Sequence, residues 1–190
     1  MRTPEGGVLW DCVSYLDDET MEAVAELGGV VAVTCSHPHF YASMVEWAHA
    51  FGAEVLVPEA DRGWVMRPDP VIRFWSGHLE IVPGVTLVQT GGHFEGSAVL
   101  HWAGAAEGRG AILTGDTVSV VADPRWVTFM RSYPNFIPLS ADAIRGIEDG
   151  LRPLRFERLY GGWSGDDVLE GAKGVVERSA ARYVEWVRGS

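Results

Sequence analysis

Residues 30–42 read VVAVTCSHPHFYA and carry the most informative pattern in the chain. The β-branched apolar run at the start of this stretch predicts a buried strand over Val30–Thr34. His37 and His39 follow directly, on either side of Pro38. A proline-stiffened turn at a strand end can aim alternate side chains at one point, which a divalent metal requires. Two histidines alone are equally typical of a polar surface loop.

Two further polar residues follow predicted strands. His93 lies in the stretch TGGHFEG after a strand over Thr86–Thr90, where glycines let the backbone come close to a ligand or to another segment of the chain. Asp116 follows the apolar strand Ala111–Thr114, and a carboxylate at such a strand end is costly unless it is paired or metal-bound. Alone, Asp116 is also typical of a helix or turn cap. Three strand ends that deliver His or Asp to one rim predict a site of the kind that binds zinc or iron.

The rest of the chain alternates strands with helices, then continues with strands alone, and ends in a long helix. Further strands are predicted over Val8–Asp11, Glu54–Pro58, Val71–Phe74, Ala98–Trp102 and Arg158–Tyr160, and helices over Asp17–Leu27, Ser43–Phe51 and Asp166–Val187. This order is typical of sheets layered against helices. Neither a repeat nor a linker interrupts the 190 residues, so we expect one domain over residues 1–190.

The composition narrows the function classes. The chain has 15 Lys and Arg against 26 Asp and Glu, a net charge of −11, so neither nucleic acid nor an anionic membrane is expected as a partner. No apolar run reaches the ~18 residues of a membrane span and no signal-peptide pattern opens the sequence, so we expect a cytoplasmic protein. Cys12 and Cys35 end apolar runs outside any CxxC pattern, which predicts two buried free thiols.

Taken in order, the HPH stretch at 37–39, the glycine-flanked His93 and the Gly-Asp pair ending at Asp116 resemble the motifs of the metallo-β-lactamase superfamily. The apolar run that ends at Asp11 resembles an earlier strand motif of that family. The resemblance spans residues 8 to about 165 and implies an α+β four-layer αββα sandwich with metal at one edge of its sheets. The family's usual N-terminal strand or hairpin is missing from the pattern. An uncovered sheet edge favours association, so a homodimer is expected.

The sequence departs from the family's HxHxDH motif after the first two histidines. Tyr41 stands at the aspartate position and Ala42 at the second histidine position, and no histidine follows His101. The family's first metal is held by residues that match His37, His39 and His93, and the carboxylate that matches Asp116 bridges to its second metal. Because the ligands unique to a second metal are missing, the resemblance implies a degenerate site with one divalent metal, zinc first, with iron or manganese as alternatives.

Such a site predicts a metal-dependent hydrolase that activates water for attack on a small-molecule ester, thioester or lactone-like substrate. Asp116 is the candidate base, and Tyr41 is a candidate hydrogen-bond donor to the developing oxyanion, although plain packing explains Tyr41 at least as well. Two alternatives stay open. One is an iron-dependent thiol or persulfide oxygenase of the same fold, and the other is a non-catalytic domain with a structural metal.

The aromatic segment Ala122–Ser140 follows Asp116 closely and could line or cover the metal pocket. Within it, Arg131 is the candidate residue for binding an anion. Trp126, Phe129 and Tyr133 are candidates for an apolar wall of a substrate site. A satellite core beneath a long loop is an equally good explanation of the same residues.

Overall fold

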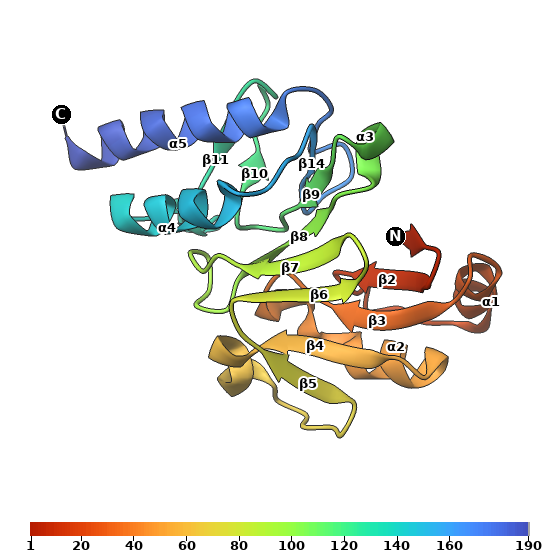
Figure 1. The fold of residues 1–190 in the computed structure, drawn as a ribbon. Helices are drawn as coiled ribbons and strands as arrows, with labels where there is room; N and C mark the ends of the chain where they lie inside the picture. The colour runs from red at the N-terminus through yellow and green to blue at the C-terminus, as the bar shows by residue number, and fades with distance from the viewer. Residues whose placement is uncertain (190) are drawn as a thin grey trace. The chain divides into compact units, whose positions relative to one another are not determined.

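A computed structural model describes residues 1–189, which form two compact units, Met1–Ser76 and a second unit that starts at Gly77. Each unit has a sheet, helices and an apolar core of its own (Figure 1). The expectation of one domain over residues 1–190 stays a prediction. No helix within residues 1–189 combines the length and the apolar character needed to cross a bilayer.

The first unit holds a five-stranded sheet in the order β1-β2-β3-β4-β5. Its strands are β1 (Arg2–Thr3), β2 (Gly6–Trp10), β3 (Val30–Thr34), β4 (Glu54–Pro58) and β5 (Ile72–Trp75). Strands β2 to β5 run parallel, whereas β1 pairs antiparallel with β2. β1, the strand that precedes β2, has only two residues. Because β2 to β5 are parallel, their carboxyl ends share one edge of the sheet.

Helices and short 3₁₀ segments make the crossovers that parallel strands require. They are α1 (Asp18–Glu26), η1 (Pro38–Ser43), α2 (Met44–Phe51) and η2 (Glu59–Trp64). Asp17 caps α1 by accepting a hydrogen bond of 2.8 Å from the Thr20 backbone N–H. Gly52, in the left-handed region with φ of 66°, ends α2.

The core of the first unit lies between α2 and strands β3 and β4. Trp47, Val33 and Val55 are buried there because the apolar face of α2 covers this side of the sheet. Cys12 and Cys35 belong to the same core, with their sulfur atoms 3.9 Å apart. Both are free and buried, so the expected pair of buried free thiols is confirmed.

The second unit holds a six-stranded sheet in the order β15-β14-β9-β8-β7-β6. Its strands are β6 (His78–Val82), β7 (Val85–Gln89), β8 (Ala98–Trp102), β9 (Ala111–Leu113), β14 (Arg158–Tyr160) and β15 (Asp167–Val168). Strands β6 to β9 form an antiparallel meander, and β14 joins β9 in parallel.

Three helices and two small ladders complete this unit. The helices are α3 (Ala105–Gly108), α4 (Ala141–Leu151) and α5 (Ala172–Arg188), and the ladders pair β10 (Ser119–Val120) with β11 (Val127–Thr128) and β12 (Met130–Ser132) with β13 (Ile137–Pro138). Helices α4 and α5 pack side by side (Figure 1). Phe129, Ile144 and Leu159 are fully buried in the core between the helices and the sheet.

The strands predicted from the sequence are present, with ends that differ by one or two residues. The helix predicted over Asp166–Val187 is wrong at its start, because Asp167–Val168 pairs with β14 as a strand and α5 begins at Ala172. Gly171, with φ of 61°, turns the chain from that strand into the helix. Among the longer elements, strand β6 and helix α4 were not predicted from the sequence.

Candidate metal centre

In the first unit, the end of β3 places His37 and His39 side by side. His37 is 1% exposed, whereas His39 lies on the surface. Their rings meet edge to face, and Nε2 of His37 lies 3.0 Å from Nδ1 of His39. Pro38 starts η1 between them and holds the two side chains in this arrangement. The predicted convergence of this pair is therefore present.

A chain of hydrogen bonds orients His37. The Asp11 carboxylate accepts from the Ser36 backbone N–H at 2.6 Å and from the Ser36 hydroxyl at 2.9 Å. The same hydroxyl oxygen lies 2.8 Å from Nδ1 of His37. A serine hydroxyl has one hydrogen, which Asp11 takes, so the hydroxyl oxygen accepts from Nδ1–H of His37. Nε2 of His37 therefore carries the lone pair, which is the form a metal ligand needs.

In the second unit, His93 and Asp116 approach each other. Nδ1 of His93 lies 3.0 Å from the backbone oxygen of Met130, which can only accept, so Nδ1 carries the hydrogen and, in the neutral imidazole, Nε2 carries the lone pair. This Nε2 lies 3.7 Å from Oδ2 of Asp116. Two ligand atoms of one zinc ion, each about 2 Å from it, lie about 3.3 Å apart. The separation in this unit is thus close to what a shared ion needs.

Gly92 lets the loop before His93 lie directly on the core. Its φ of 93° is in the left-handed region, and a Cβ there would come within 2.9 Å of Ile147 and 3.1 Å of Leu139. The close backbone approach expected of the glycines around His93 is present, and its partner is the core of the second unit.

The metal site predicted from the sequence takes two donors from each unit, His37 and His39 from the first and His93 and Asp116 from the second. Three imidazole nitrogens and one carboxylate oxygen suit zinc or iron better than calcium or magnesium, which prefer oxygen ligands. The residue types at these positions therefore fit the metal that the sequence predicts.

Arg131 and Tyr133 hold the backbone around the second-unit donors. The Arg131 guanidinium donates a hydrogen bond to the backbone oxygen of His93. The Tyr133 hydroxyl donates to the backbone oxygen of Asp116 at 3.1 Å, and its ring lies 5.8 Å from that of His93. Burial, with a contribution from the Asp116 charge, raises the pKa of Tyr133, so the hydroxyl stays protonated at neutral pH. A role of either residue in substrate binding stays a prediction.

Trp126, another aromatic candidate in this segment, packs against α5. The guanidinium of Arg182 lies 3.5 Å from the centre of the Trp126 ring. Val127, Phe129 and Leu139 of the same segment are buried in the core of the second unit. The segment 122–140 therefore combines core packing with contacts to His93 and Asp116, and the predicted substrate role of Trp126 stays a prediction.

Tyr41 is buried, and its hydroxyl donates a hydrogen bond of 3.1 Å to Oδ2 of Asp61. Burial and the charge of Asp61 both raise the pKa of Tyr41. Donation to an oxyanion would require this hydrogen bond to break, because a phenol has a single hydrogen. The catalytic role predicted for Tyr41 stays a prediction.

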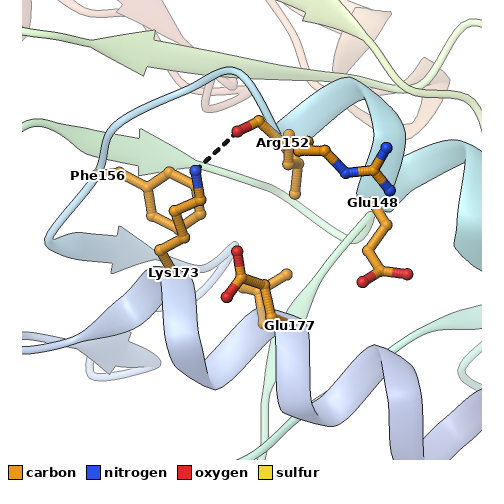
Figure 2. Close-up of a pocket in the computed structure, with 7 residues that line it drawn as sticks. Glu148, Arg152, Phe156, Lys173 and Glu177 are labelled. Carbon is orange, nitrogen blue, oxygen red and sulfur yellow. Dashed lines mark hydrogen bonds between the residues drawn. The ribbon is translucent and has the colours of Figure 1, made fainter.

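A small cavity lies between α4 and α5, and the lysine that lines it has a structural role (Figure 2). Its volume of about 30 Å³ is about that of one water molecule. Lys173 crosses it and donates hydrogen bonds of 2.7 and 2.8 Å to the backbone oxygens of Arg152 and Leu154. These oxygens follow the end of α4, so Lys173 stabilises the helix terminus.

Solved structures identify the fold. The metallo-β-lactamase SMB-1, crystallised with mercaptoacetic acid, matches 97% of this chain and 86% of its own, with a TM-score of 0.63 and 16% identity. A metallo-β-lactamase from Staphylococcus aureus subsp. aureus COL matches 96% of this chain and 59% of its own, with a TM-score of 0.64 and 13% identity. The chain has the metallo-β-lactamase fold. The α+β fold class expected from the sequence is confirmed.

The metallo-β-lactamase fold is shared with a quorum-quenching N-acyl homoserine lactone lactonase, which matches 85% of this chain and 76% of its own at a TM-score of 0.57 and 18% identity. In sequence, the chain is 50% identical over 179 residues to the uncharacterized protein YmaE of Bacillus subtilis (strain 168). That match covers 94% of this chain, which spans only 65% of the length of YmaE. No family model matches the chain.

Sequence reasoning missed the residues that orient the candidate ligands. Asp11 and Ser36 are 25 positions apart, and Met130 lies 37 positions from His93. One signal was present: Asp11 ends a strand that runs parallel to β3, so its side chain lies at the same sheet edge as Ser36.

Proposed function

We propose that the protein is a metal-dependent hydrolase with one divalent metal, zinc, held by His37, His39, His93 and Asp116. The observation that supports this proposal most directly is which nitrogen carries the hydrogen in two histidine rings. Nε2 of His37 and Nε2 of His93 both carry lone pairs, because the other nitrogen of each ring donates a hydrogen bond to a fixed acceptor. Imidazole rings whose hydrogen is fixed on one nitrogen by such a hydrogen bond, with the lone pair on the other nitrogen, are typical of metal ligands.

The residues after His39 support a single metal. The HxHxDH motif that the sequence resembles has Asp and His where this chain has Tyr41 and Ala42. An alanine methyl group binds no metal, and the Tyr41 hydroxyl is hydrogen-bonded to Asp61. These substitutions support a site with one metal rather than two.

Held by the three histidines, with Asp116 as a weak ligand that leaves one position open, a zinc ion would lower the pKa of a coordinated water to about 7 and polarise a carbonyl oxygen. Asp116 would accept the proton of the attacking water. Its carboxylate is partly exposed, and Tyr133 holds its backbone in place. Arg131 holds the backbone of His93 and so keeps that ligand aligned with Asp116.

The substrate class is a small ester, thioester or lactone. The lactonase with the same fold, whose name states that it acts on N-acyl homoserine lactones, supports a substrate of this kind. A single metal is less suited to phosphodiesters, for which a two-metal clamp is the usual device.

The test measures the hydrolysis of aryl esters, thioesters and lactones by protein loaded with zinc, with iron or with manganese. We expect hydrolysis by the zinc form, with a loss of activity in Asp116→Asn and His93→Ala. His49→Ala is the control, because His49 is exposed and pairs with Asp69. Oxygen uptake with thiols or persulfides by the iron form, without hydrolysis by any form, would replace the proposal with the oxygenase alternative. Unchanged turnover in Arg131→Ala would remove any role of Arg131 in substrate binding.

A further inference from the structure

A pocket of about 350 Å³ lies in the first unit, beside His39. One wall comes from η1 and the start of α2, with Ala42 and Met44, and the other from the end of η2 and the segment after it, with Trp64 and Met66. Its volume falls within the roughly 300–1,000 Å³ that is usual for small-molecule sites. Of the residues that line this pocket, Tyr41 was predicted from the sequence to contact the substrate, as a donor to the oxyanion, and His39 was predicted to bind the metal.

The lining of the pocket is apolar. Met66 is 84% exposed and Trp64 is 53% exposed, although large apolar side chains are normally buried. Two thioether side chains, Met44 and Met66, face the same space and can adapt to a flexible ligand. Arg67 lies at the rim, but Glu46 pairs with its guanidinium, so its charge is already compensated. We therefore expect an apolar group to bind in this pocket more favourably than an anion.

The pocket also adjoins the candidate metal site through His39, which lines it. Tyr41 and Ala42, which stand where the resembled motif has Asp and His, line the same pocket. The substitutions that remove ligands for a second metal therefore leave apolar surface next to a ligand of the first. A substrate with its carbonyl group at the metal would place the apolar chain attached to that carbonyl in this space.

We infer that this pocket binds the unbranched apolar chain of the substrate's acyl group, and so favours medium-chain acyl esters, thioesters or lactones over acetyl ones. The inference rests on the proposed function for the position of the reacting carbonyl. Occupation of the pocket by an apolar chain rests on the first unit alone.

The experiment is a titration of zinc-loaded and zinc-free protein with octanohydroxamate and with acetohydroxamate, two probes that differ only in chain length. Protein carrying ¹³C-methyl methionine reports the location directly, because Met44 and Met66 line the pocket, whereas Met21 lies on α1. We expect octanohydroxamate to shift the Met44 and Met66 signals and leave Met21 unchanged. We also expect it to bind about tenfold or more tightly than acetohydroxamate, because burial of methylene groups is favourable.

Two variants and one control localise the effect. Met66→Glu introduces a charge on an exposed side chain of the pocket, and Ala42→Leu fills part of the space at an exposed position. Both are expected to reduce the preference for the longer probe about fivefold or more. Leu27→Glu is the matched control, because Leu27 is 52% exposed at the end of α1 in the same unit. It is expected to keep the full preference.

The outcomes separate the pocket from the metal site. Equal affinity for the two probes, or a preference that Met66→Glu and Ala42→Leu leave intact, overturns the pocket even if zinc strengthens the binding of both probes. A chain-length preference that both variants reduce, with affinities that zinc does not change, supports the pocket and contradicts the proposed metal site.

Discussion

The Ser36 hydroxyl oxygen lies 2.8 Å from Nδ1 of His37 and links that ring to the Asp11 carboxylate. This link fixes Nδ1 of His37 as the nitrogen that carries the hydrogen, so that Nε2 has the lone pair that a metal ligand needs. The three residues come from the ends of two neighbouring parallel strands, so the sheet itself positions the ligand.

Ser36→Ala removes this link while keeping the ring and its surroundings. We expect the affinity for zinc to fall about 10–100-fold, because loss of an orienting partner weakens a metal ligand by that factor. Competition with a chromophoric chelator measures the affinity. Ser43→Ala is the control, because Ser43 is also buried but donates to the backbone oxygen of Val13 at 2.8 Å. Equal zinc affinity in wild type and Ser36→Ala would contradict the role of the link.

His93→Ala is expected to remove the stabilisation that zinc provides. A ligand that binds only the native state stabilises it by about 2.7 kcal/mol at a free concentration of 100 times its Kd. Thermal unfolding with and without zinc measures this gain in Tm. The gain should be retained in His101→Ala, because His101 lies on β8 with its ring bound to the backbone oxygen of Arg155. A full zinc-induced gain in His93→Ala would show that the ligand assignment is wrong.

Two phenylalanines of segment 122–140 should differ sharply in their contribution to stability. Phe129 is fully buried and packs edge to face against Tyr183, so Phe129→Ala should lower the free energy of unfolding by about 3–5 kcal/mol. Phe136 is 83% exposed, so Phe136→Ala should change it by less than about 0.5 kcal/mol. Urea unfolding followed by circular dichroism measures both. Similar losses in the two variants would contradict the placement of this segment.

The stability of Asp167→Asn should depend on pH relative to wild type. Burial, followed by the charge of Asp166, raises the folded-state pKa of Asp167 above its ordinary value of 3.8. Stability that wild type has below pH 3.8 is therefore lost as the pH rises through the folded pKa. Asp167→Asn should have a higher Tm than wild type at pH 7, and the difference should vanish near pH 3.

Asp123→Asn is expected to change the stability at pH 7 in the opposite direction. Hydrogen bonds from Arg125 lower the pKa of Asp123 to about 2, so its contribution is present above its ordinary pKa of 3.8 and is lost as the pH falls through about 2. Asp123→Asn should be less stable than wild type at pH 7. An Asp167→Asn variant that behaved like Asp123→Asn would contradict the burial of Asp167.

The strands and the four candidate ligands were predictable because their signals are local. A β-branched run followed by HPH marks β3 and its two histidines, and Gly-rich or Gly-Asp strand ends mark His93 and Asp116. Helix α4 was not predictable in the same way, because Gly146 and Gly150 lower its helix propensity. It forms because its apolar face is buried in the core of the second unit and Ser140 caps its first turn.

The remaining features depend on contacts between distant parts of the chain. The helix expected from Asp166 starts at Ala172 because β14 pairs with Asp167–Val168, which outweighs the local helical pattern. The hydrogen bonds that orient His37 and His93 join residues far apart in sequence, so no local pattern reveals them. The apolar pocket beside His39 likewise depends on how residues 64–67 return to η1.

The most direct test of the central claim is the number of metal ions bound per chain. Elemental analysis of chelator-treated protein, reloaded with zinc and freed of excess metal, is expected to give about one zinc per chain in wild type and well below that in His37→Ala and His93→Ala. Two zinc ions per chain in wild type, none at all, or a full complement in both variants would contradict a single metal held by these histidines.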